Sequence, residues 1–144
     1  RAGFKIIAAK MLEPDYEHYF EHYEGIGTLK SRKGDEIFKG QLAAMQDGPV
    51  IALVLEGVKA VEAVRKMVGD TEPNSALPGT IRGDYAHVTY GQAASTGRGV
   101  ANILHASASR EEADKEIAHW FKSDELHSYQ AVHEKFTQPK KSEG

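Results

Sequence analysis

The sequence predicts a sheet covered by helices within a single domain. Two apolar runs, FKIIAAKM over 4–11 and VIALVL over 50–55, have the length and composition of β-strands. Between and after these runs, apolar residues recur at helical spacing, and one such segment begins with a capping motif at Ser109. Because strands and helices alternate, each can bury its apolar side against the other, which indicates helices packed on a sheet.

The composition is that of an ordinary globular protein and narrows the range of functions. The 144 residues are 40% hydrophobic and 27% charged, with a net charge of −3, which disfavours a nucleic-acid-binding surface. The absence of cysteine excludes disulfides, zinc–thiolate sites and a cysteine nucleophile, and we expect a cytoplasmic location. We expect no signal peptide, and no apolar run in the sequence is long enough to span a membrane.

The first half of the chain divides at prolines and glycines. The elements expected in order are a strand over 4–11, a helix over 15–24, a flexible basic loop over 25–34, a helix over 35–46 and a strand over 50–55. Pro14 ends the first strand, and Asp15 can cap the helix that follows. The run over 50–55 is apolar at every position, which is typical of a central strand covered on both faces.

The second half contains the best-marked helix and the longest loops. The elements expected in order are a helix over 60–68, a loop over 70–82, a short strand over 87–90, a flexible excursion over 91–99, a short strand over 103–104, a helix from Ser109 through Phe121 and a last helix over 126–136. Ser109 and Glu112 have the spacing of a capping box. We place the domain over 1–138 and a flexible tail over 139–144.

His105 is the strongest candidate for chemistry among the seven histidines. It stands at the end of the apolar pair 103–104, just before a helix whose first N–H groups can face an anion. A neutral imidazole nitrogen is a nucleophile toward phosphorus, and Glu116 can accept the other ring N–H and so fix the tautomer. The alternative is that His105 is a structural residue.

The other six histidines fit surface or structural roles: His18, His22, His87, His119, His127 and His133. His18 and His22 lie one helical turn apart, but a metal site at that pair lacks a third ligand in the sequence pattern. Arg65 and Arg82 carry guanidinium groups suited to phosphate oxygens, and surface ion pairs are the alternative for each.

Taken together, these residues resemble the nucleoside diphosphate kinase family. The matching segments are Glu21-His22-Tyr23, Gly48-Pro49-Val50, Leu55-Glu56-Gly57, Arg65–Gly69, Thr71, PGTIRGD over 78–84, NILHAS over 102–107, Glu116-Ile117, Trp120-Phe121 and Glu125-Leu126. The combination of PGTIRGD with a downstream N-x-x-H-[AG]-S is highly specific. The resemblance covers most of the chain.

The resemblance implies a fold, a reaction and a set of site residues. The fold is an α+β, ferredoxin-like βαββαβ sandwich with an antiparallel sheet, assembled into homohexamers or homotetramers. The reaction moves the γ-phosphate of a nucleoside triphosphate to a diphosphate through a phosphohistidine, with Mg²⁺ held by nucleotide phosphates. By position, His105 is the nucleophile, Glu116 orients it, Ser107 and Tyr23 are active-site hydroxyls, Arg65, Thr71 and Arg82 contact phosphate, Asn102 contacts ribose and Ile37 contacts the base. The substrates implied are ATP, ADP, GTP, GDP and their deoxy forms.

The chain departs from the family pattern in four ways, and the missing lysine motif, Ile37 and Ala108 support a second hypothesis. The family's first strand, with its Lys-Pro-Asp-Gly motif, has no counterpart before Arg1, so we expect a fragment of a longer protein. Ile37 and Gln41 replace a stacking Phe and a Leu, Ala108 replaces an acidic residue, and the segments 25–34 and 86–99 are longer than usual. The alternative function is a weakly active nucleotide-binding regulatory or interaction module of the same fold.

Overall fold

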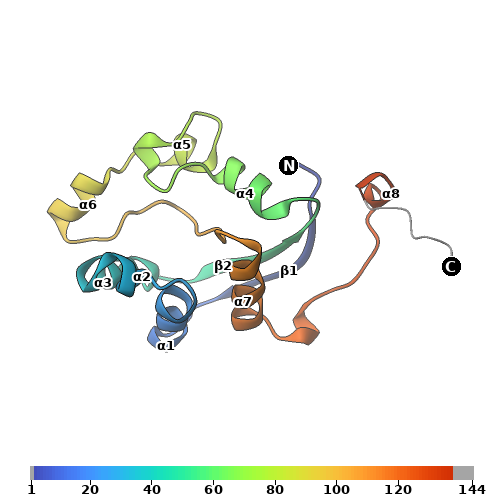
Figure 1. Cartoon of the computed structure of the whole chain (residues 1–144), viewed down its shortest axis with the longest axis horizontal. Helices are drawn as coiled ribbons and strands as arrows, with labels where there is room; N and C mark the ends of the chain where they lie inside the picture. The colour runs from blue at the N-terminus through green and yellow to red at the C-terminus, as the bar shows by residue number, and fades with distance from the viewer. Residues whose placement is uncertain (1, 138–144) are drawn as a thin grey trace.

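A two-stranded antiparallel sheet lies at the centre of the molecule (Figure 1). The structure, a computed structural model, describes residues 2–137. Strand β1 (Lys5–Leu12) pairs with β2 (Val50–Glu56) from Leu12 opposite Val50 to Lys5 opposite Glu56. The register shifts between Ile6 and Ala8, where a bulge sets Ile7 aside. The α+β class with an antiparallel sheet and covering helices is confirmed.

The segment after β1 is more helical than the sequence indicates. Its elements are α1 (Tyr16–Phe20), a π-helical stretch η1 (Glu21–Ile26), α2 (Leu29–Lys33) and α3 (Asp35–Met45). Helix α1 begins where expected because Asp15 accepts the His18 N–H at 2.8 Å. The prediction of a flexible loop over 25–34 is wrong, since α2 forms there. The Glu24 carboxylate accepts the Lys30 and Ser31 N–H groups at 2.7 and 3.1 Å and so caps α2.

The remaining elements follow β2 in a long excursion and then return to the sheet. They are α4 (Ala60–Val68), the 3₁₀ turn η2 (Pro73–Ser75), α5 (Ile81–Tyr85), α6 (Tyr90–Thr96), α7 (Arg110–Trp120), the 3₁₀ turn η3 (Ser123–Glu125) and α8 (Glu134–Thr137). In Figure 1, α4, α5 and α6 form a row on one side of the molecule, and α1, α2 and α3 lie on the opposite side. None of the helices within 2–137 has the length and apolar character that crossing a bilayer requires.

Helix α6 replaces the strand over 87–90 and the flexible excursion over 91–99 that the sequence suggests, so both predictions are wrong. Thr89 caps the helix by accepting the Gln92 N–H at 3.1 Å, and Gly97, at φ +66°, ends it. Its first residue, Tyr90, donates its N–H to the Glu72 carboxylate at 2.7 Å. These caps and the burial of Ala93 stabilise a helix in a segment whose glycines and small polar residues suggest a loop.

Two further predictions about strands are corrected. The pair 103–104 is no strand: Ile103 has φ +74°, and the Leu104 N–H donates to the Asn102 carbonyl at 2.9 Å, so the backbone turns. Strand β2 is not covered on both faces, because Ile51 is 65% exposed and Leu53 is 52% exposed. Ile51 and Leu53 share one face of the strand, so it is this face that is exposed.

The last part of the described chain runs along β1 instead of forming a helix over 126–136. The His127 N–H donates to the Ile7 carbonyl at 2.8 Å, at the position where the β1–β2 register shifts. The Tyr129 hydroxyl donates to the Ile6 carbonyl at 2.6 Å, and Lys5 pairs with Glu134 at 2.6 Å. Only α8 is helical there, and the expected tail over 139–144 lies outside the described residues.

Two buried clusters form the core, and α7 lies between them. One cluster consists of Tyr19, Tyr23, Phe38 and Leu42 from η1, α1 and α3. The other consists of Ala8, Val54 and Phe121 from the sheet and the end of α7. Trp120 packs against both clusters, and burying apolar side chains of this size stabilises the fold by about 1.5–3 kcal/mol each. This packing fixes α7, and therefore Glu116, relative to η1.

Candidate active site

His105 and Glu116 form the centre of the site. The Nε2 atom of His105 lies 2.7 Å from Oε1 of Glu116, which α7 presents one and a half turns after its start. The Glu116 side chain is buried, whereas the His105 side chain is 37% exposed and so can meet a ligand. An ionised carboxylate can only accept, so Nε2 carries the proton and the lone pair of a neutral ring is on Nδ1.

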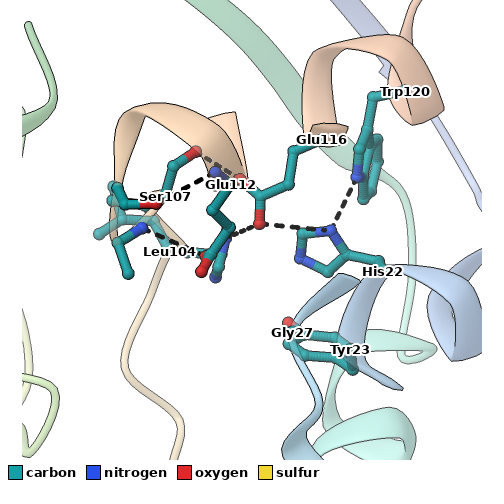
Figure 2. A network of polar contacts seen from close by, with 12 residues as sticks. His22, Tyr23, Gly27, Leu104, Ser107, Glu112, Glu116 and Trp120 are labelled. Carbon is teal, nitrogen blue, oxygen red and sulfur yellow. Dashed lines mark hydrogen bonds and ion pairs between the residues drawn. The ribbon is translucent and has the colours of Figure 1, made fainter. Parts of the chain in front are cut away.

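The Glu116 carboxylate has a second donor in Ser107. The Ser107 hydroxyl donates to Oε2 of Glu116, so both carboxylate oxygens are bonded (Figure 2). Burial alone raises the pKa of Glu116, but hydrogen bonds from His105 and Ser107 outweigh it, so the pKa lies below its ordinary value. The carboxylate is therefore charged at neutral pH and holds the His105 ring in one tautomer.

A second histidine, His22, completes this cluster and is the residue that the sequence analysis missed. Figure 2 shows His22 between Trp120 and Glu116. The Trp120 indole N–H donates to Nδ1 of His22 at 3.0 Å, and the His22 and His105 rings meet edge to face with centroids 4.5 Å apart. Burial, with repulsion from His105, lowers the pKa of His22 to about 3, so the ring is neutral. No spacing in the sequence links residues 22, 105 and 120; only the family motif around 21–23 marks the position.

The π-helical stretch η1 brings both His22 and Tyr23 to the site. Its wider turn is closed by the Gly27 N–H, which donates to the His22 carbonyl at 3.1 Å. The Tyr23 ring lies 6.2 Å from the His105 ring, and Gln41 donates to the Tyr23 hydroxyl at 3.3 Å. Burial raises the pKa of Tyr23 to about 12, so its hydroxyl keeps its proton. Such π-helical turns are frequent at functional sites.

Arg82 is almost fully buried and ties the segment before His105 to the rest of the fold. Its guanidinium donates to the carbonyls of Asn102, Gly69 and Leu104 at 3.2, 3.2 and 2.6 Å. The family resemblance implies that Arg82 contacts a phosphate. In the structure, three of its five N–H groups donate to backbone carbonyls, which leaves two N–H groups for a ligand. These hydrogen bonds fix the backbone of residues 102–104, and therefore the position of His105, although the segment is not a strand.

Arg65, Asn102 and Thr71 lie around the same segment. The Arg65 guanidinium donates to the Ala106 carbonyl at 3.3 Å, and Asn102 donates its amide N–H to the Thr71 carbonyl at 3.1 Å. Arg65 and the neighbouring Lys66 line a pocket of about 560 Å³ between α4 and the loop 70–80. The pocket therefore presents the positive groups of Arg65 and Lys66 beside the carboxylates of Glu62 and Asp70, and Arg65 connects it to the residue after His105.

Ile37 lies on the outward side of α3, where its side chain is 55% exposed. The same helix approaches the segment that precedes Asn102, since the Gly99 N–H donates to the Gly40 carbonyl at 3.2 Å. Both positions are glycine, and a Cβ on Gly99 would lie 2.7 Å from that carbonyl oxygen. The contact fixes the distance between α3 and the segment leading to His105.

The start of α7 differs in detail from the expected capping box. Ser109 accepts the Glu112 N–H at 3.1 Å as predicted. The Glu112 carboxylate, however, accepts the Ala108 N–H at 3.2 Å and not that of Ser109. The Glu112 carboxylate therefore bonds the N–H one residue before the one that a capping box uses, and the Ala108 N–H is not free to face an anion.

One set of side chains among the described residues has the spacing of a metal site. One atom each of His22, His105 and Glu116 lies within 4.8 Å of the others. Two imidazoles and one carboxylate suit transition metals, whereas Mg²⁺ prefers oxygen ligands and keeps several waters. The ligand set of these three side chains is therefore not one that suits Mg²⁺.

Comparison with known proteins places the chain in a family. The family described as nucleoside diphosphate kinase matches residues 1–126. A nucleoside diphosphate kinase from Borreliella burgdorferi is 37% identical over 129 residues, covering 90% of this chain and 77% of the relative, and one from Pyrococcus furiosus is 38% identical, covering 98% and 80%.

Solved structures agree with the sequence relatives. The Borrelia burgdorferi enzyme, a transition-state mimic with bound vanadate and ADP, has a TM-score of 0.88 at 36% identity and covers 93% of this chain and 79% of that one. A Halobacterium salinarum enzyme in complex with CDP has a TM-score of 0.74 at 32% identity, covering 92% and 78%. The chain, with His105 and Glu116 paired beside Arg65 and Arg82, belongs to the nucleoside diphosphate kinase family.

Proposed function

We propose that this phosphotransferase moves the γ-phosphate of a nucleoside triphosphate to a nucleoside diphosphate through a phosphohistidine at Nδ1 of His105. The observation that carries the proposal is the 2.7 Å contact between Nε2 of His105 and the buried Glu116 carboxylate. This contact places the proton on Nε2 and leaves Nδ1 as the nucleophile. Membership of the family supports the reaction class.

The reaction has two halves with one intermediate. In the first, Nδ1 attacks the γ-phosphorus, an N–P bond forms, and the bond from phosphorus to the β–γ bridging oxygen breaks, so the diphosphate leaves with the electron pair. In the second, a terminal oxygen of another diphosphate attacks the phosphorus and the N–P bond breaks. Throughout, Glu116 keeps the Nε2 proton and balances the positive charge that develops on the ring.

The residues around His105 supply the remaining roles in this proposal. They are Arg65, Thr71 and Arg82 for phosphate oxygens, Asn102 for ribose, Ile37 for the base, and the Ser107 and Tyr23 hydroxyls as site donors. The two N–H groups of Arg82 that hold no carbonyl support a phosphate contact. Because Ile37 offers an apolar surface without hydrogen-bonding groups, we expect little discrimination between bases.

The cofactor and partners follow from the same proposal. Mg²⁺ would be held through nucleotide phosphates and would neutralise charge there. The substrates are ATP, ADP, GTP, GDP and their deoxy forms, supported by the ADP and CDP complexes of the similar structures. We also propose a homohexamer or homotetramer, and a cytoplasmic location in keeping with the lack of cysteine.

A weakly active nucleotide-binding regulatory module is the alternative, and one observation favours it. Three Arg82 N–H groups bond backbone carbonyls, which reduces what that side chain can offer a transferring phosphate. Such a module would bind nucleotide with little turnover. The two proposals therefore differ in how fast phosphate is transferred, and nucleotide binding alone does not separate them.

Incubation with γ-labelled ATP, followed by a chase with unlabelled GDP, tests the proposal. We expect an acid-labile label on the wild-type chain that GDP releases as GTP. The His105→Ala variant should take no label, and His127→Ala, which removes an exposed histidine from the segment along β1, should label like wild type. Nucleotide binding without any label on the wild-type chain would support the regulatory module instead.

A further inference from the structure

His22 and Trp120 are joined by a hydrogen bond in addition to their packing contact, and this hydrogen bond lies next to Glu116. The His22 side chain is only 4% exposed, and its Nδ1 atom faces two groups at once. One is the Trp120 indole N–H at 3.0 Å, and the other is Oε1 of Glu116 at 3.7 Å. That oxygen is the one that His105 bonds at 2.7 Å.

The Trp120 hydrogen bond decides which nitrogen of His22 carries the proton. An indole N–H can only donate, so Nδ1 of His22 must accept and its proton must be on Nε2. The titratable groups facing His22 are His18 and Tyr23 on its own helical segment, His105 before α7, and Glu116 and His119 on α7. Among these, Glu116 alone favours a proton on His22, and burial opposes it.

The protonation of His22 determines how many hydrogen-bond donors Oε1 of Glu116 has. A His22 ring with a proton on Nδ1 would donate to Oε1 and compete with His105 for the same oxygen. With Nδ1 occupied by the Trp120 donor, Oε1 has His105 as its only imidazole donor. The edge-to-face contact of the two rings, with centroids 4.5 Å apart and planes 83° apart, also restricts rotation of His105.

We propose that His22 and Trp120 are positioning residues for phosphorylation of His105: the Trp120 N–H keeps Nδ1 of His22 an acceptor, so that Glu116 serves His105 alone. This inference rests on the proposed function, in which His105 is the nucleophile. His22 and Trp120 are not among the residues proposed to contact the nucleotide.

Three variants separate positioning from packing. Trp120→Phe keeps the aromatic body and removes the donor. His22→Leu keeps the volume and removes both ring nitrogens, whereas His22→Asn places an amide oxygen close to the position of Nδ1 and preserves an acceptor for Trp120. The matched control is His119→Leu, which removes a half-buried histidine next to Trp120 that donates to the His18 carbonyl at 2.9 Å.

The first readout is single-turnover labelling of the chain by γ-labelled ATP, with nucleotide affinity measured separately. We expect Trp120→Phe to slow labelling about 10- to 100-fold, because Nδ1 of His22 is then free to carry a proton and compete for Glu116. His22→Leu should slow labelling less, because it removes the ring contact with His105 but also removes the competing nitrogen. Nucleotide affinity should stay within about threefold. His22→Asn should recover most of the rate, and His119→Leu should label like wild type.

The second readout is the tautomer of His105 by ¹⁵N NMR of the unphosphorylated chain, which needs no activity. We expect the Nε2–H form in wild type and in His22→Leu, which has no competing N–H, and a mixture of both forms in Trp120→Phe. A wild-type labelling rate and an unchanged tautomer in Trp120→Phe would overturn this inference and leave the proposed function standing. A wild-type chain with the Nε2–H tautomer that takes no label would instead contradict the proposed function.

Discussion

Replacing Arg82 by lysine tests whether this side chain holds the path of the chain into the active site. The guanidinium donates to three backbone carbonyls in two segments that are distant in sequence, at Gly69 and at Asn102 and Leu104. A lysine ammonium can reach one of these carbonyls in place of three, because it lacks the planar fork of donors. Two half-buried carbonyls therefore lose their partner.

The size of the effect follows from those two hydrogen bonds. Each bond from a charged donor contributes about 1.5–3 kcal/mol, which gives about 3–6 kcal/mol for two, and local relaxation reduces the expected loss to about 3 kcal/mol. A domain with about 5–15 kcal/mol of stability tolerates this loss and stays folded. The variant should therefore be measurable by equilibrium unfolding.

Urea unfolding followed by circular dichroism measures the difference in the free energy of unfolding. The matched control is Arg110→Lys, whose wild-type side chain is 84% exposed and pairs with Asp114, and which should change stability by less than about 0.5 kcal/mol. An Arg82→Lys variant as stable as wild type within about 0.5 kcal/mol would refute the assignment, because the carbonyls would then have other partners.

Three other predictions use the same contacts. Glu116→Gln puts a neutral amide beside Nε2 of His105 and weakens a charge-assisted hydrogen bond of about 1.5–3 kcal/mol. Single-turnover labelling by ATP should therefore slow by about 10- to 100-fold. An unchanged rate would show that Glu116 does not select the tautomer of His105. Burial holds the pKa of His22 at about 3, below its unfolded value of about 6.5, so the folded state binds fewer protons. Its contribution to stability is therefore complete above pH 6.5 and is lost as pH falls toward 3, by up to about 1.4 kcal/mol per pH unit. Unfolding in urea between pH 7 and 5 should show this loss, and His22→Asn should reduce the slope; equal slopes would contradict the cause. Gly99→Ala brings a Cβ within 2.7 Å of the Gly40 carbonyl oxygen on α3 and should lower the free energy of unfolding by about 1–3 kcal/mol. Gly91→Ala in α6 meets nothing closer than 3.9 Å and should raise the free energy of unfolding by about 0.5–1 kcal/mol. Thermal unfolding that ranks the two variants in the opposite order would count against the contact between Gly99 and α3.

The helices that the sequence predicted well carry their own start and stop signals. Asp15 begins α1, Ser109 begins α7, and glycine follows α4 at position 69. Helix α2 was missed because its cap is the side chain of Glu24, six residues before Lys30, and no local motif places a carboxylate there. The strand expected over 103–104 was wrong since strand formation depends on a neighbouring strand, and the chain instead turns at Ile103.

The site was predicted in part. The pairing of His105 with Glu116 and the nearness of Ser107 agree with what the sequence and the family motifs indicate. The place of His22 was not predictable from spacing, because it depends on the π-helical turn at 21–26 and on Trp120, 98 residues away. Periodicity reports which side of a helix is apolar, but it does not report which buried histidine meets another element.

The position of the phosphate on the histidine ring tests the central claim most directly. Wild-type protein phosphorylated with ATP in the presence of Mg²⁺ would be studied by ³¹P and ¹⁵N NMR, which distinguish phosphorus on Nδ1 from phosphorus on Nε2. Because Oε1 of Glu116 lies 2.7 Å from Nε2 of His105 and accepts its proton, we predict a phosphate on Nδ1 of His105. A phosphate on Nε2 of His105, or on any other residue, would contradict the role given to Glu116.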